Sequence, residues 1–115
     1  MTHKETKKYH DAQKEQLVRT LDIYGTWKLK LLADKLGIFP RQVKYLVQEL
    51  RHANYPIGYG QNGYFLAKDD AELCHTKNKF KIKNQTTVQT MYDLDNANYN
   101  IDELKERDFG DEAVE

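Results

Sequence analysis

Residues 25–66 read GTWKLKLLADKLGIFPRQVKYLVQELRHANYPIGYGQNGYFL, and this stretch decides the fold. Leucines and an alanine recur at helical spacing over residues 28–36, and Gly37 then tolerates the left-handed backbone that often ends a helix. Pro40 suits the first turn of a second helix, which the apolar spacing extends to residue 51. Over residues 57–66, glycines and an asparagine divide two short apolar runs, which predicts two strands joined by a tight turn.

Another helix is predicted upstream, over residues 11–24. Asp11 suits its N-cap position, apolar residues follow at helical spacing, and Gly25 ends it. Thr26 and Trp27 form an extended bridge that we expect to pair with the hairpin. Three helices followed by a hairpin is the order of a winged helix-turn-helix, which presents one helix to the DNA major groove. The predicted fold class is mainly α with a small β-hairpin, followed by a C-terminal helical extension.

The helix over residues 40–51 has two contrasting faces. Its apolar residues fall on one side and are expected in the core: Val43, Leu46, Val47 and Leu50. At about 100° per residue, the residues opposite are cationic, amide or aromatic, with no acid among them: Arg41, Lys44, Tyr45, Gln48 and His52. Such side chains bind phosphates and base edges, which favours DNA binding over a merely solvated face.

The predicted DNA contacts extend beyond this helix to the preceding helix and to the hairpin tip. They are Lys28, Lys30, Arg41, Gln42, Lys44, Tyr45, Gln48, His52, Tyr59, Gln61 and Asn62. The charge distribution agrees with this prediction. Residues 1–68 carry 12 Lys and Arg against 6 Asp and Glu, whereas residues 69–115 carry 6 against 12. A basic body with an acidic tail is typical of a domain that binds a polyanion.

Composition limits the remaining possibilities. A chain of 115 residues with 39% hydrophobic residues can form one domain with a modest core. A mean hydropathy of -0.88 and the lack of a long apolar run argue against a membrane span. The N-terminus shows no secretory signal, and the single cysteine, Cys74, fits a reducing compartment. We therefore expect a cytoplasmic protein.

The two ends of the chain are predicted to lie outside the main domain. Residues 1–10 are polar and expected to form a flexible arm before a domain over residues 11–67. Residues 68–92 predict a C-terminal helix, and residues 93–115 predict an acidic, largely disordered tail with a short helix near residues 101–106. The segment over residues 70–92 has an imperfect heptad, so it could join two chains as a homodimer, pack on the first helix or run along DNA.

The sequence contains no recognisable set of residues with the types and spacing of a catalytic site. Cys74 and His75 form an isolated pair, and the other histidines lack the spacing of metal ligands. We expect no enzyme activity, no cofactor and no metal.

Short motifs in the decisive stretch resemble a known family. LLADKLG at residues 31–37, RQV at 41–43, LR at 50–51, YPI at 55–57 and GYFL at 63–66 are similar to the N-terminal winged helix of biotin operon repressors. They are also similar to small phage-encoded or regulatory proteins built on that module.

The resemblance covers residues 11–67. It implies DNA binding by the third helix and the wing, commonly as a dimer. Phe39 stands where the family has a Ser or Thr cap. Residues 1–115 show no resemblance to the ligase domain of that family, so we expect no biotin chemistry from them.

Two hypotheses follow. The first is a double-stranded DNA-binding protein, a transcriptional or phage-type regulatory factor. The second is a winged-helix protein-interaction module that acts through a protein partner, as a DNA mimic or an adaptor.

Overall fold

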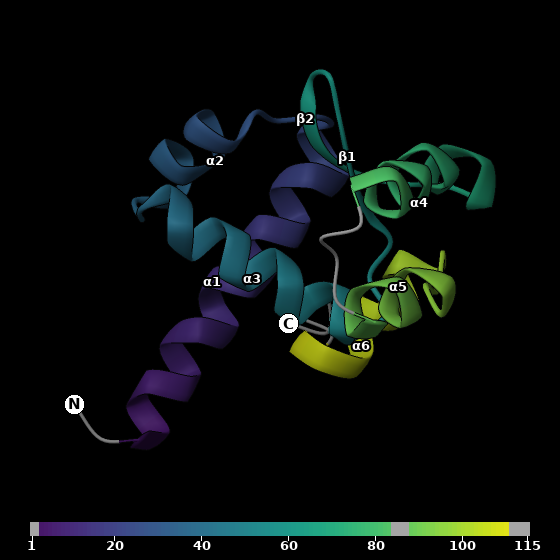
Figure 1. The fold of residues 1–115 in the computed structure, drawn as a ribbon. Helices are drawn as coiled ribbons and strands as arrows, with labels where there is room; N and C mark the ends of the chain where they lie inside the picture. Colours follow the sequence, from purple (N-terminus) through teal and green to yellow (C-terminus); the bar gives the residue numbers. More distant parts are fainter. Residues whose placement is uncertain (1–2, 84–87, 111–115) are drawn as a thin grey trace.

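Helices dominate the chain, with one small β-hairpin among them (Figure 1). The computed structural model describes residues 3–83 and 88–110. In chain order the elements are α1 (His3–Tyr24), α2 (Leu29–Leu36), α3 (Pro40–His52), β1 (Ile57–Gly60), β2 (Gly63–Leu66), α4 (Asp70–Lys83), α5 (Val88–Asp95) and α6 (Ile101–Phe109). The predicted class, mainly helical with a small hairpin, is confirmed. Within the described residues, no helix has both the length and the apolar character needed to cross a bilayer.

The hairpin is antiparallel and is tied to the residue that precedes α2. Its register pairs Ile57 with Leu66 at the open end and Gly60 with Gly63 at the turn. The Trp27 N–H donates to the Tyr64 carbonyl at 3.0 Å, and the Tyr64 N–H donates to the Trp27 carbonyl at 2.8 Å. The expected pairing of the extended bridge with the hairpin is therefore confirmed.

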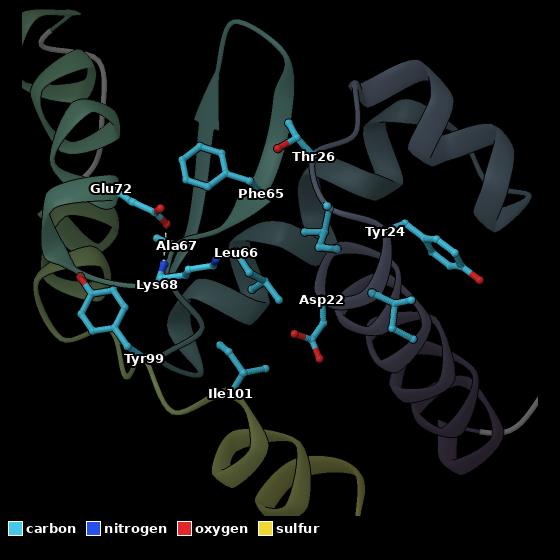
Figure 2. Close-up of a pocket in the computed structure, with 13 residues that line it drawn as sticks. Asp22, Tyr24, Thr26, Phe65, Leu66, Ala67, Lys68, Glu72, Tyr99 and Ile101 are labelled. Carbon is cyan, nitrogen blue, oxygen red and sulfur yellow. Dashed lines mark hydrogen bonds between the residues drawn. The ribbon is translucent and has the colours of Figure 1, made fainter.

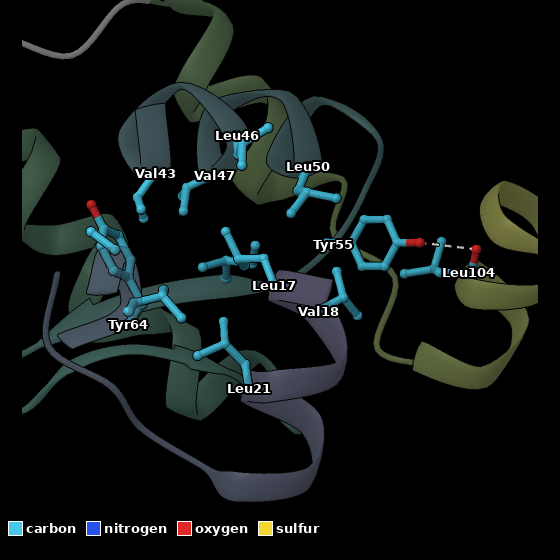
Figure 3. Close-up of a cluster of buried hydrophobic side chains, with 13 residues drawn as sticks. Leu17, Val18, Leu21, Val43, Leu46, Val47, Leu50, Tyr55, Tyr64 and Leu104 are labelled. Carbon is cyan, nitrogen blue, oxygen red and sulfur yellow. Dashed lines mark hydrogen bonds between the residues drawn. The ribbon is translucent and has the colours of Figure 1, made fainter. Parts of the chain in front are cut away.

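The main core lies between α1, α2, α3 and the hairpin (Figure 3). The apolar residues predicted for the inner face of α3 are each at most 2% exposed: Val43, Leu46, Val47 and Leu50. They pack against Leu17 and Val18 of α1, both fully buried. Because one face of α3 is fixed against this core, its opposite face is fixed as well.

The N-terminal helix is longer than the sequence pattern predicts. It begins at His3, so residues 3–10 belong to α1, and Asp11 lies within the helix rather than at its N-cap. Residues 3–10 contain neither Gly nor Pro and include Lys and Glu, which are good helix formers. Helix propensity here outweighs the polar composition that suggested a flexible arm.

The acidic C-terminal part also differs from the prediction of a largely disordered tail, which is wrong for residues 93–110. Leu94 of α5 and Leu104 of α6 are each 1% exposed. The Tyr55 hydroxyl donates to the Leu104 carbonyl at 3.0 Å, which ties α6 to the main core (Figure 3). Burial of a few leucines stabilises this segment despite its acidic composition. The short helix predicted near residues 101–106 is confirmed, and residues 111–115 lie outside the described part.

The segment predicted as one helix over residues 68–92 contains two helices, α4 and α5, and residues 84–87 between them lie outside the described part. Leu73 of α4 and Leu94 of α5 are buried with Ala67 in a second, smaller core. Leu73, an apolar residue of this segment, is therefore already buried within the chain. A homodimer through residues 70–92 stays a prediction, and it would need residues other than Leu73.

Acid is expected to destabilise the fold. A hydrogen bond from Lys77 lowers the pKa of Asp70, and one from Arg107 lowers the pKa of Asp108, although burial opposes both shifts. Because the folded state favours each carboxylate, this stabilisation is present above the ordinary carboxyl pKa and is lost as the pH falls through the lowered value. We expect the midpoint of thermal unfolding to be lower at pH 3 than at pH 6.

Circular dichroism melts across this pH range measure the effect. Asp70→Asn should weaken the dependence on pH, because it removes one of the carboxyl groups whose pKa is lowered in the folded state. A midpoint that stays constant between pH 6 and pH 3 would contradict the prediction.

Candidate functional site

The exposed side of α3 brings together the residues singled out in its sequence. All five of them lie at the surface, opposite the buried face: Arg41, Lys44, Tyr45, Gln48 and His52. Tyr45 is 50% exposed although it is aromatic. We call these five residues the outer face of α3. Neither Tyr45 nor Gln48 is drawn into the core, so both are available to a partner.

Glu49 is the one acid of α3 and borders this outer face, and Lys14 of α1 neutralises it. The Lys14 ammonium lies 2.7 Å from the Glu49 carboxylate. Burial acts to raise the pKa of Glu49, but hydrogen bonds from Lys14 and Tyr45 outweigh it and lower that pKa. The bond to Glu49 in turn raises the pKa of Tyr45. The phenol is therefore neutral and oriented, and the acid adds little net negative charge.

The C-terminal end of the outer face meets α5. Nδ1 of His52 lies 3.2 Å from Oδ1 of Asp93, whose side chain is 5% exposed. Together with Lys14, Tyr45 and Gln48, these two residues line a groove of about 630 Å³ between α1, α3 and α5. Sequence reasoning missed Asp93, because it lies 41 residues from His52 and no local pattern links them. The contact with an acid makes His52 the least suited of the five to bind a phosphate.

Gln42 has a structural task at the start of α3. Its side-chain oxygen accepts a hydrogen bond from the Phe39 N–H at 2.9 Å. Phe39 offers no side-chain acceptor for the first N–H groups of α3, so Gln42 supplies only the reciprocal bond of a capping box, to the N–H of the N-cap residue. Gln42 remains exposed, but one of its polar atoms is already engaged within the chain.

The predicted contacts outside α3 are also exposed. Lys28 and Lys30 lie at the start of α2, and Lys28 directly follows the residue that pairs with the hairpin. The predicted contacts at the hairpin tip are exposed too, with Tyr59 at 41%: Tyr59, Gln61 and Asn62. The pairing of Trp27 with Tyr64 therefore places the start of α2 beside the hairpin.

The cations of this region are not neutralised. Within the described residues, four of the predicted contacts are exposed basic side chains that form no ion pair with a carboxylate: Lys28, Lys30, Arg41 and Lys44. By contrast, Lys77, Lys105 and Arg107 in the C-terminal part all pair with acids. The predicted contacts on α2 and the outer face of α3 therefore carry positive charge that no carboxylate of the described residues neutralises.

An open pocket of about 810 Å³ lies elsewhere, between the end of α1, β2, the start of α4 and the segment before α6 (Figure 2). Its two carboxylates are already engaged. Asp22 accepts from the Lys105 ammonium at 2.9 Å, and Glu72 accepts from the Lys68 N–H at 2.7 Å. Within the described residues, no group of three or more His, Cys, Asp or Glu side chains is placed to hold a metal ion. The outer face of α3 is thus the better candidate site.

Comparison of the chain with protein-family models, curated proteins and solved structures found no match.

Proposed function

We propose that this protein binds double-stranded DNA as a winged helix-turn-helix regulatory factor, of the transcriptional or phage type, without catalytic activity. The observation that carries the proposal is the outer face of α3, which is exposed, cationic and without an acid of its own. The order of three helices and a hairpin supports it, as does the resemblance to the winged helix of biotin operon repressors. In this arrangement α3 enters the major groove and the hairpin contacts the flanking backbone.

The side chains divide into two roles. Tyr45 and Gln48 lie at the middle of α3 and are suited to base edges, since an amide can pair with adenine and a tyrosine can pack on a base. Lys28 and Lys30 at the start of α2 are suited to phosphates, which position a protein without reading sequence. Arg41 and Lys44 can serve either role.

A gel-shift titration on random duplex tests the proposal. If about five phosphates are neutralised, log K should fall with log[salt] at a slope of roughly -4 to -5. Replacing both Tyr45 and Gln48 by Ala should change the preference among sequences, with about 1–3 kcal/mol of discrimination lost at the affected base pairs. Lys30→Ala should instead weaken all sequences alike.

If the double replacement of Tyr45 and Gln48 and the Lys30→Ala change weakened binding to every sequence equally, the assignment of base-reading and phosphate-binding roles would be refuted. A folded protein that shifts no duplex at any salt concentration would end the proposal and favour a module that binds a protein partner.

A further inference from the structure

The hairpin has two edges, and each is covered by a different segment. Trp27 pairs with the outer edge of β2 at Tyr64. The outer edge of β1 faces α4, which lies beside the hairpin in Figure 1. An isolated two-stranded hairpin is only marginally stable in water, so what holds its second edge decides how well its tip is positioned.

Thr76 of α4 closes the edge of β1. Its hydroxyl oxygen accepts a hydrogen bond from the Tyr59 N–H at 2.9 Å and donates to the Tyr59 carbonyl at 3.4 Å. The Thr76 side chain is 2% exposed. One hydroxyl therefore takes the place of a neighbouring strand at the residue that begins the hairpin tip.

The rest of α4 is anchored away from the hairpin. Leu73 is fully buried in the second core. The Lys77 ammonium lies 2.7 Å from Asp70 and 3.4 Å from Asp95, which joins α4 to α5. Because these contacts fix the position of α4, Thr76 holds the hairpin against a rigid support.

Lys79 lies three residues after Thr76 and reaches the hairpin tip. Its ammonium is 5.8 Å from the centre of the Tyr59 ring, within the range of a cation–π contact. Tyr59 in turn packs edge-on against Tyr64, with ring centres 4.8 Å apart. Unlike Lys77, Lys79 pairs with no carboxylate in the described part of the chain. The tip thus carries a positive charge that the sequence pattern did not assign to it.

We propose that α4 is part of the DNA-binding surface: Thr76 positions the hairpin, and Lys79 contacts a backbone phosphate beside the hairpin tip. This inference rests on the proposed binding of DNA. An ammonium has three donors, so Lys79 can remain over the Tyr59 ring and still donate to a phosphate oxygen. A ligand of this kind is a phosphodiester backbone, recognised without regard to sequence.

The test compares two lysines that share the same intramolecular contact. Lys35 of α2 lies 5.9 Å from the centre of the Tyr24 ring, which belongs to α1 and not to the hairpin tip. On random duplex, Lys79→Ala should reduce the steepness of log K against log[salt] by about 0.9, the loss of one phosphate contact. Lys79→Arg should keep the wild-type slope, and Lys35→Ala should leave it unchanged. Thermal melts confirm that each variant is folded.

Thr76→Val tests the positioning role, with Thr76→Ser as its control. The valine should abolish hydrogen-exchange protection of the Tyr59 amide and reduce the salt slope as Lys79→Ala does, whereas the serine should preserve both. Combining Thr76→Val with Lys79→Ala should reduce the slope no further, because both changes remove the same contact.

The outcomes separate the two proposals. If the wild-type protein binds duplex but Lys79→Ala keeps its slope, or changes it no more than Lys35→Ala does, the role of α4 is overturned while the binding of DNA stands. If the wild-type protein binds no duplex at all, both are overturned.

Discussion

Replacing Leu104 by Ala should lower the free energy of unfolding by about 2–5 kcal/mol, the usual cost of emptying a buried leucine site. Leu104 is 1% exposed, and its side chain packs in the main core although α6 lies in the acidic C-terminal part. The Tyr55 hydroxyl also donates to its backbone carbonyl. Urea unfolding followed by circular dichroism measures the change.

A leucine of similar chemistry but different burial provides the control. Leu31 of α2 is 54% exposed, so Leu31→Ala should change the free energy of unfolding by no more than about 0.5 kcal/mol. Equal effects of the two substitutions would mean that α6 does not pack on the core as described. The larger effect of Leu104→Ala would show that the C-terminal part is structural rather than an appended tail.

The helices and strands around α3 were predictable because their signals are local. Gly37 has φ +70 at the end of α2, and Pro40 begins α3, both as the sequence indicates. Alternation between apolar and polar residues at helical spacing fixed which side of α3 is buried. Such signals depend on neighbours a few residues apart, and no distant contact is needed to read them.

The C-terminal part was not predictable in the same way. Leu94 and Leu104 are isolated apolar residues in an acidic stretch, and their burial depends on partners far along the chain. Tyr55, for example, bonds to a carbonyl 49 residues away. Composition alone suggested disorder there, but it cannot show that single leucines reach two separate cores.

The candidate site likewise combines features that local sequence signals predict with contacts between residues far apart in the chain. Exposure of the outer face of α3 follows from helical periodicity, and that part of the prediction needed only the sequence. The contact of Asp93 with His52, the neutralisation of Glu49 by Lys14 and the support of Tyr59 by Thr76 each join different elements. These contacts decide which charges remain available, and only the folded chain reveals them.

Gly63 is where the hairpin, the extended bridge and the start of α2 meet, and Gly63→Ala should lower the free energy of unfolding by about 2–6 kcal/mol. Its φ is +116, which strains a residue with a Cβ by about 1–3 kcal/mol. A Cβ there would also overlap the Trp27 carbonyl and lie 2.6 Å from the Lys28 nitrogen. Moving them apart would break the two hydrogen bonds between Trp27 and Tyr64, each contributing about 0.5–1.5 kcal/mol.

Gly60 faces Gly63 across the turn and supplies the matched control. A Cβ on Gly60 would meet only the Phe65 ring, at an ordinary 3.8 Å, so Gly60→Ala should change stability by no more than about 1 kcal/mol. Chemical denaturation of both variants gives the comparison. If Gly63→Ala were as stable as Gly60→Ala, the bridge would not hold the hairpin. If the protein binds DNA as proposed, Gly63→Ala should also weaken binding to all sequences, because Lys28 and the hairpin tip would lose their shared support.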